Sequence, residues 1–201
     1  KLERVIKGQM DGIGPRPPCS DEEELACHLI SGELAEMGRV PEVSEFRSCR
    51  SFGPAYLAIF GTALLSSVTA CRFPRFSAIA GMKAAALALI ESRFAARSPL
   101  NVLLNSTSRN VEATIEPSGG VERTVCLVSH MDSSRSGLMF HPKVTPYLGK
   151  AVAAAGAAVM LQALSPVLRR IPLGKAVLAG SRALIVTGFG LVLEREIRGE
   201  D

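Results

Sequence analysis

The chain has 201 residues, and 47% hydrophobic residues with only 5% aromatic ones suggest that much of the apolar content lies outside an ordinary core. The net charge of +4 comes from Arg and Lys beside apolar segments, which anionic lipid headgroups explain better than nucleic acid does, so no nucleic-acid partner is expected. The five cysteines form no C-x-x-C pair, which argues against both a disulfide framework and a cysteine zinc site.

The first predicted helix covers residues 21 to 37. Ser20-Asp-Glu-Glu23 has the spacing of a capping box, apolar residues then recur at helical spacing, and Gly38 provides a stop. A strand is expected over Val40 to Phe46, where Pro41 suggests a sheet edge or a late start.

The first strongly apolar region runs from 54 to 90. Residues 54–71 carry no charge, and eighteen residues is about the length that crosses a bilayer. Residues 76–90 form a poorer span because Lys83 lies inside it, and a central lysine costs roughly 2.5 to 3.5 kcal/mol on insertion scales. A short basic turn connects the two segments, so we expect a helical hairpin that returns the chain to the side it left.

Two strands are predicted between the apolar regions. Asn110 to Ile115 alternates apolar and polar side chains, and a Gly-containing turn follows. Residues 124–129 form an apolar run that predicts a buried strand, with Cys126 in the core. The two strands should form a hairpin.

The second strand runs into a His-x-Asp motif. His130 and Asp132 would lie beyond the carboxyl end of a strand, where ligands gather in α/β sheets. An imidazole there could bind a metal while the carboxylate fixes the orientation of its ring; the alternative is a strand-end histidine near a surface aspartate. His141 is expected to be a solvated loop residue, and His28 a surface or boundary residue of the first helix.

A second apolar region runs from 147 to 193. Residues 151–168 are free of charge, whereas 176–193 contain Arg182. These two segments are joined by a basic turn, so we expect a second helical hairpin. Small residues within the two segments would let the helices approach closely in lipid. Both short turns are basic, so the positive-inside rule places them in the cytoplasm and the polar segments outside.

Five features follow one another along the chain in a recognisable order. They are Ile13-Gly-Pro-Arg-Pro-Pro-Cys-Ser20, the helix through Gly38, the strand ending at Phe46, the strand start at Asn110-Val111, and His-x-Asp. Together they resemble the opening third of the co-catalytic zinc aminopeptidase family, whose relatives include bacterial leucyl aminopeptidases, glutamate carboxypeptidase, glutaminyl cyclase and the transferrin receptor ectodomain. The resemblance covers residues 10–52 and 100–142. Cys19 departs from the glycine usual before the serine, and the hairpins suggest a membrane-embedded branch.

The resemblance implies an α/β fold, namely a partial mixed-sheet zinc-exopeptidase domain interrupted by two helical, transmembrane hairpins. It implies that His130 binds one of two zinc ions, that Asp132 serves catalysis by holding its ring, and that the ions activate a bridging water against a peptide substrate. The family's other ligands would follow Asp201, so we expect an N-terminal fragment that is inactive alone.

The expected protein is thus a multi-pass, membrane-anchored zinc aminopeptidase, contacting membrane lipid, with an extracytoplasmic peptidase domain. One alternative is a non-catalytic membrane scaffold or receptor of the same fold. Another is a small soluble α/β protein with long buried helices and no metal. The expected domain segments are 1–53 and 91–146 for the peptidase, 54–90 and 147–193 for the hairpins, and 194–201 for the start of the remainder.

Overall fold

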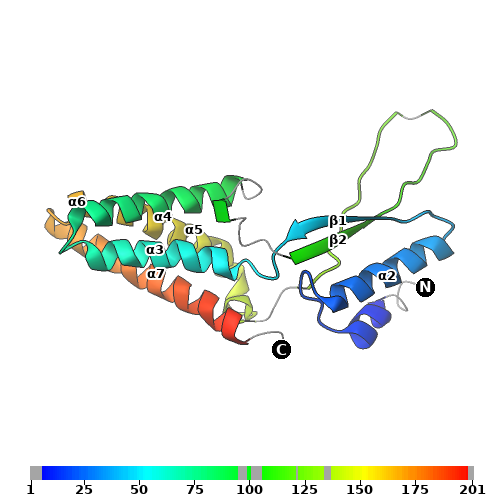
Figure 1. Ribbon diagram of the computed structural model, residues 1–201, viewed down its shortest axis with the longest axis horizontal. Coiled ribbons are helices and arrows are strands. Elements are labelled where there is room, and N and C mark those ends of the chain that lie inside the picture. The colour runs from blue at the N-terminus through cyan, green and yellow to red at the C-terminus, as the bar shows by residue number, and fades with distance from the viewer. Residues whose placement is uncertain (1–5, 95–98, 101–105, 121, 134–136, 199–201) are drawn as a thin grey trace. The chain divides into compact units, whose positions relative to one another are not determined.

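The computed structural model describes residues 6–94, 99–100, 106–120, 122–133 and 137–198 (Figure 1). The described chain is mostly helical and forms two compact units. One unit comprises residues 1–50 and 104–135, and the other comprises 51–103 and 136–199. The predicted peptidase segment 91–146 is therefore divided between the two units.

The first unit pairs one long helix with a small sheet. It contains a π-helical turn η1 (Gly8–Ile13), helix α2 (Asp21–Glu36) and the antiparallel strands β1 (Glu42–Ser48) and β2 (Ser106–Glu112). No further strand is found in the described ranges, so the mixed sheet that the sequence predicted is replaced by a two-stranded antiparallel one. The expectation of an α/β fold is corrected to a mostly helical one with this small sheet.

Helix α2 begins and ends where the sequence predicted, to within one residue. The Ser20 hydroxyl accepts a hydrogen bond of 3.2 Å from the Glu23 amide at the N-terminus. At the other end Gly38 has φ +71°, and its amide donates to the Ala35 carbonyl at 2.9 Å. Glycine suits this position because the left-handed region penalises a Cβ atom.

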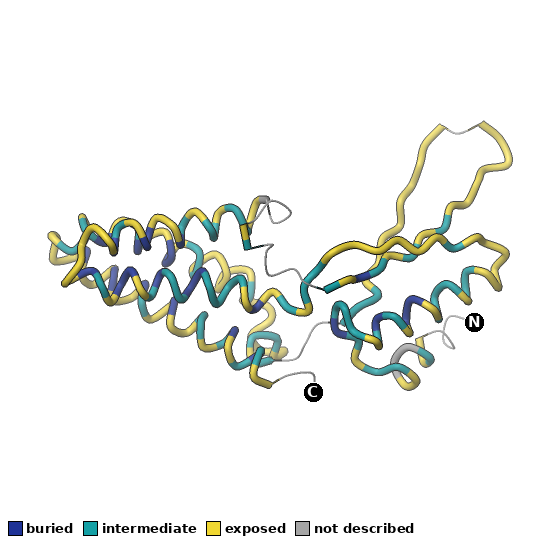
Figure 2. The backbone as a smooth tube through the Cα atoms, in the orientation of Figure 1, coloured by how far each residue is buried: buried dark blue, intermediate teal, exposed yellow. Residues whose placement is uncertain are grey.

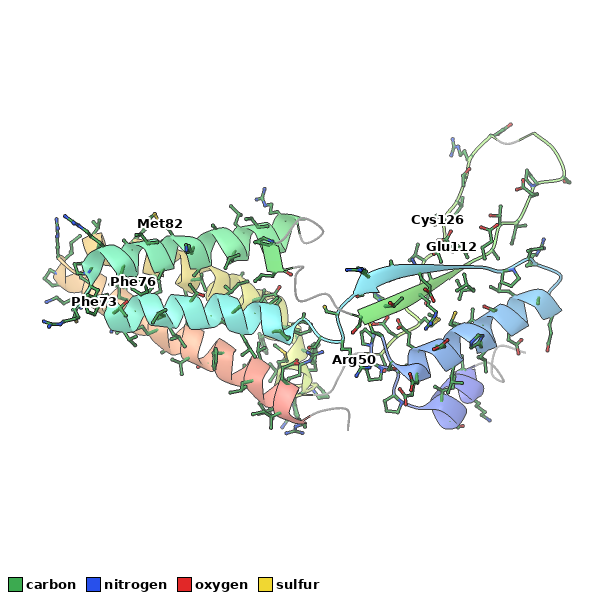
Figure 3. The ribbon with its side chains drawn as sticks, in the orientation of Figure 1. Arg50, Phe73, Phe76, Met82, Glu112 and Cys126 are labelled. Atoms are coloured by element: carbon green, nitrogen blue, oxygen red, sulfur yellow. The ribbon has the colours of Figure 1, made fainter. Side chains whose placement is uncertain are left out.

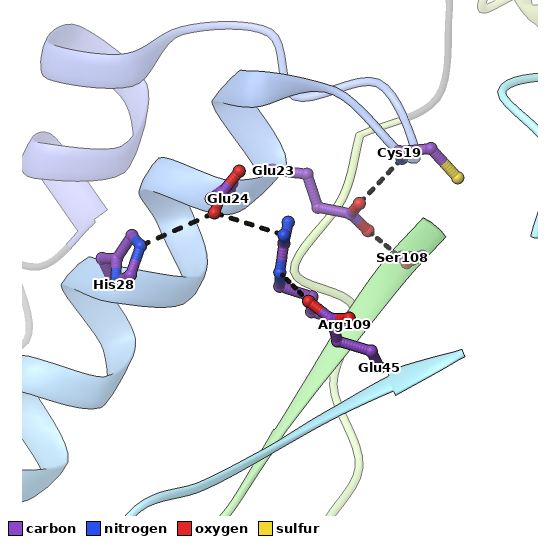
Figure 4. Close-up of polar contacts among 7 residues, drawn as sticks. All are labelled: Cys19, Glu23, Glu24, His28, Glu45, Ser108 and Arg109. Atoms are coloured by element: carbon purple, nitrogen blue, oxygen red, sulfur yellow. Dashed lines mark hydrogen bonds and ion pairs between the residues drawn. The ribbon is translucent and has the colours of Figure 1, made fainter. Parts of the chain in front are cut away.

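A buried carboxylate joins α2 to β2 (Figure 4). Glu23 is 4% exposed and accepts one hydrogen bond from the Cys19 amide and one from the Ser108 hydroxyl, both of 2.7 Å. Beside it, the guanidinium of Arg109 in β2 forms two ion pairs. Its Nη2 lies 3.2 Å from Oε1 of Glu24 in α2, and its Nε lies 3.2 Å from Oε1 of Glu45 in β1. The helix therefore packs on the sheet with polar contacts at the interface, and Ala26 of the same helix is fully buried.

Both strands are displaced from their predicted positions. β1 covers 42–48 rather than 40–46, because the chain enters the ladder only after Pro41. β2 begins at Ser106 and ends at Glu112, whereas the prediction ran from Asn110 to Ile115. β1 pairs with β2 over their full lengths, with Ser48 opposite Ser106.

The predicted buried strand at 124–129 is not formed. These residues have no regular secondary structure, and Val125, Leu127 and Val128 are 79%, 93% and 89% exposed (Figure 2). Cys126, predicted as a core residue, is exposed as well. Strand burial requires a neighbouring strand or helix, and β2 uses β1 as its partner instead of this run.

The second unit is a bundle of the two predicted helical hairpins (Figure 1). Helix α3 packs beside α4 and α7, and α5 also contacts both α4 and α7. Proline is the first residue of α4 and of α7, a position where its fixed φ and missing N–H suit a helix start. The elements are α3 (Gly53–Thr69), α4 (Pro74–Phe94), η4 (Leu138–Phe140), η5 (Thr145–Tyr147), α5 (Leu148–Ala163), α6 (Ser165–Leu168) and α7 (Pro172–Arg198).

Polar and small residues lie inside this bundle among the apolar core. The hydroxyls of Ser66 and Ser77 each donate to the other residue's carbonyl oxygen at 2.7 Å, joining α3 to α4. Gln162 of α5 donates to the Ser181 hydroxyl of α7, and all four of these residues are at most 3% exposed. The apolar core consists of Ile59, Phe60, Ala63, Ala84, Ala158, Val159, Ile185 and Val192.

The outside of the bundle carries many large apolar side chains. Only α7, among the described helices, is long and apolar enough to cross a membrane, and 22% of its apolar window is buried; a core helix of a soluble protein can pass the same test. Helix length and composition thus support one span rather than the four that the sequence predicted. Helices α3 and α5 are too short, with 17 and 16 residues, and α4, with 21, is not apolar enough. The exposed side chains include Leu65, Val68, Phe76, Ile79, Met82, Leu89, Val152, Leu173, Leu184 and Val186.

Candidate metal centre

The structure brings His130 and Asp132 together. The Nδ1 atom of His130 lies 3.0 Å from Oδ1 of Asp132, and the two side chains are 94% and 28% exposed. With its proton on Nδ1, the imidazole donates to the carboxylate and keeps the Nε2 lone pair for a metal. This is the arrangement that a ligating histidine and its orienting carboxylate require.

Arg16 holds the backbone on either side of Asp132. Its amide donates to the Ser133 hydroxyl at 2.7 Å, its carbonyl accepts from the Ser133 amide at 2.7 Å, and its Nε donates to the Met131 carbonyl at 3.0 Å. A further hydrogen bond of 2.8 Å runs from Nη1 to the carbonyl of Gly14. This role of Arg16 was not predicted from the sequence; the signal that could have found it is its position between two prolines, which restrict the backbone of the loop.

Cys19 adopts a conformation that favours glycine. Its φ is +61°, in the left-handed region, where a residue that has a Cβ atom is strained and glycine is not. Burial raises the pKa of its thiol, while a hydrogen bond with Ser48 acts in the opposite direction. The cysteine at this position thus carries backbone strain next to Ser20, the residue that caps α2.

The described residues do not complete a metal site. Within the described ranges, no group of three or more His, Cys, Asp or Glu side chains is placed to hold a metal ion. Structural zinc takes four protein ligands and catalytic zinc about three, so His130 with Asp132 fits one ligand and its orienting partner. A two-zinc centre would need ligands from other segments.

The other two histidines lie elsewhere. His28 is on α2, with Nε2 3.9 Å from a carboxylate oxygen of Glu24. His141 belongs to the second unit, where its Nδ1 accepts a hydrogen bond of 3.2 Å from the Lys143 amide and the residue lines an open pocket beside Phe140 and Arg198. Neither residue joins the His130 pair as a further ligand in the described structure.

A buried arginine anchors one end of the bundle. Arg195 of α7 is 3% exposed, donates to the Ser51 hydroxyl at 2.8 Å, and lies 3.0 Å from the Glu196 carboxylate. Its guanidinium carbon is 4.1 Å from the ring centre of Phe52 and 5.8 Å from that of Phe140. These contacts join the start of α3, the end of α7 and η4, so the residue has a positioning role that periodicity could not predict.

Comparison with models of protein families, with curated protein sequences and with solved structures finds no match. The comparisons therefore assign neither a family nor an activity. The features of the chain that bear on its function are the His130 pair, the loop that holds it and the surface of the bundle.

Proposed function

We propose that this chain supplies the first zinc ligand of a membrane-anchored, two-zinc exopeptidase that removes N-terminal residues from peptides. The observation that carries the proposal is the 3.0 Å contact between His130 Nδ1 and Asp132 Oδ1. Zinc, when bound, would polarise the peptide carbonyl and lower the pKa of a coordinated water. In this proposal His130 binds through Nε2, and Asp132 fixes the tautomer and the direction of the ring.

The contacts of Arg16 support the same proposal. A metal ligand that is held in place beforehand binds the metal more tightly, because ordering a loop on binding costs conformational entropy. Arg16 ties Met131 and Ser133, the residues on either side of Asp132, to the Gly-Pro-Arg-Pro loop by three hydrogen bonds of 2.7 to 3.0 Å. The loop and the His-x-Asp motif, which the resemblance linked by sequence alone, are therefore in direct contact.

Zinc binding by the purified chain tests the assignment of His130. Equilibrium dialysis should show weak binding, with a dissociation constant above about 1 μM, since a single imidazole cannot match a complete site. The variant His130→Ala should lose this binding, and the matched control His141→Ala should keep it. Unchanged binding in His130→Ala, or no binding at all, would favour the non-catalytic scaffold, and tight stoichiometric binding would contradict an incomplete site.

The surface of the bundle supports the membrane part of the proposal. Its interior holds hydrogen-bonded pairs such as Ser66 with Ser77, while large apolar side chains such as Val68 and Leu173, 75% and 74% exposed, face outward. Lipid tails satisfy an apolar exterior, and interhelical hydrogen bonds are typical of helices that associate in lipid. We propose that α7 crosses the bilayer and that the other bundle helices enter with it.

Helix lengths set a condition on this arrangement. Helix α7 is about 40 Å long, whereas α3 and α5 are each about 25 Å, slightly less than the hydrocarbon core. Short helices are accommodated by local thinning of the bilayer. On phase separation with a mild non-ionic detergent, the chain should enter the detergent-rich phase; recovery in the aqueous phase would favour the soluble alternative.

A further inference from the structure

Two turns meet at one end of the helical bundle. The α3–α4 turn, residues 70–73, lies beside the α5–α6–α7 connection because Arg169 donates from its guanidinium to the sulfur of Cys71. Helices α4 and α6 are also in contact. These turns lie at the end away from Ser51 and Arg195, since α3 runs from Gly53 to Thr69 (Figure 1). We call this end the basic tip.

The basic tip concentrates positive charge. Its cations are Arg72, Arg75, Arg169, Arg170 and Lys175. All except Arg169 are exposed. The sequence contains no Asp or Glu from 54 to 90 or from 133 to 193, so the turns supply no counter-charge, and the acidic residues of α4 and α7 (Glu91, Glu194 and Glu196) lie near the other ends of those helices.

Apolar side chains are exposed among these cations. Phe73 lies next to Arg72 in the turn and is 58% exposed, and Phe76, at the start of α4, is 48% exposed (Figure 3). Ile171, just before α7, and Leu173, in the first turn of α7, are 49% and 74% exposed. Cations and aromatic rings at the end of an apolar bundle are the combination found where a protein crosses from hydrocarbon to headgroups.

We propose that the basic tip binds the headgroups of anionic phospholipids, with Phe73 and Leu173 inserted among the acyl chains. The inference rests on the proposed membrane insertion and adds to it the lipid class and the residues that recognise it. Each Lys or Arg near an anionic leaflet contributes to attraction, and high salt screens that attraction. Nucleic acid would complement the positive charge but would leave the exposed apolar side chains in water.

A fluorescent reporter at the tip can test this lipid preference. The chain has no tryptophan, so Phe73→Trp introduces a single indole without background. The full chain carrying this substitution is reconstituted into phosphatidylcholine bilayers that contain either brominated phosphatidylserine or brominated phosphatidylcholine at equal mole fraction. Bromine quenches only indoles that touch the brominated lipid, so the ratio of quenching gives the relative association constant of the two headgroups.

The expected ratio favours phosphatidylserine by about threefold or more, and falls towards one in 1 M NaCl. Replacing the four exposed cations Arg72, Arg75, Arg170 and Lys175 by Gln should also bring it towards one. A control with the same change in net charge replaces Arg39, Arg47, Arg50 and Arg123, all exposed in the first unit, and should keep the preference.

The outcomes separate this inference from the proposal on which it rests. Strong quenching by both lipids with a ratio near one would overturn the headgroup preference and leave membrane insertion standing. A preference that persists after the four tip substitutions would overturn the assignment to these residues. No quenching by either lipid would overturn insertion at this end and the lipid inference with it.

Discussion

Arg16 and Ser133, far apart in the sequence, exchange two hydrogen bonds of 2.7 Å, one from the Arg16 amide to the Ser133 hydroxyl and one from the Ser133 amide to the Arg16 carbonyl. The Arg16 side chain adds a 3.0 Å hydrogen bond to the Met131 carbonyl. Because a hydrogen bond from a charged donor contributes about 1.5 to 3 kcal/mol, Arg16→Ala should loosen the segment around Asp132.

Amide hydrogen exchange at Ser133 measures this loosening. Its protection should fall by about 10- to 100-fold in Arg16→Ala, the factor that corresponds to 1.5 to 3 kcal/mol. Arg39→Ala, which removes an exposed arginine from the first unit, is the control and should leave the exchange unchanged. Equal protection in the parent chain and in Arg16→Ala would show that the side chain does not hold this segment.

Glycine at position 19 should stabilise the first unit. The left-handed φ of +61° costs a residue with a Cβ atom about 1 to 2 kcal/mol, and Cys19→Gly relieves most of it. Cys19→Ala keeps the Cβ atom and removes the thiol, so the difference between the two variants isolates the backbone effect. In urea denaturation, the free energy of unfolding of Cys19→Gly should be about 1 kcal/mol higher than that of Cys19→Ala. An equal or lower free energy of unfolding would contradict the backbone strain.

The sequence predicted local features well and long-range ones poorly. Helix α2 was predicted because Ser20 and Gly38 act within a few residues of the backbone they cap. The contact of His130 with Asp132 was also predictable, because residues two apart on an extended segment point to the same side.

The wrong predictions concern packing contacts with distant segments of the chain, which composition and local pattern do not reveal. Val125 to Val128 reads as a buried strand only if another element covers it, and in the described structure β2 pairs with β1 instead. The buried Arg195 was unpredictable for the same reason, since its burial depends on Phe52 and Phe140 from distant parts of the chain.

Burial of the Cys27 thiol should make the first unit less stable at high pH. Cys27 is 2% exposed, and burial is the main cause that raises its pKa. Above the ordinary thiol value of about 8.5, the unfolded chain loses this proton while the folded chain keeps it, so stability falls as pH rises through that value.

Pulsed alkylation in urea, read by mass spectrometry, gives the midpoint at which Cys27 becomes reactive. The urea concentration at this midpoint should decrease as the pH is raised from 8 to 9.5. The exposed Cys71 should react without urea at every pH. A midpoint that stays constant or rises over this range would show that the thiol does not contribute to the pH dependence.

The close approach of α4 to α5 depends on Gly81. A Cβ atom there would lie 2.8 Å from the Gln162 carbonyl oxygen and 2.9 Å from the Ala163 Cα, so the backbones would have to separate. Gly81→Ala should therefore destabilise the bundle by about 1 to 3 kcal/mol. Gly156 of α5 has open space at the same position, and Gly156→Ala should stabilise by up to about 1 kcal/mol through helix propensity.

Thermal unfolding of the two variants in the same detergent gives the comparison directly. The melting temperature should fall for Gly81→Ala and stay equal or rise for Gly156→Ala. A lower melting temperature for both would point to a general effect of the methyl group, and an unchanged value for Gly81→Ala would contradict the close packing.

The nitrogen resonances of the imidazole of His130 test the central claim most directly, since the chain contains only three histidines. On titration with zinc, Nε2 of His130 should show the shift of a ligated nitrogen while Nδ1 stays protonated against Asp132. At the same zinc concentrations His28 and His141 should not change. Ligation through Nδ1, or a His130 that responds no more than the other two, would contradict the proposed metal site.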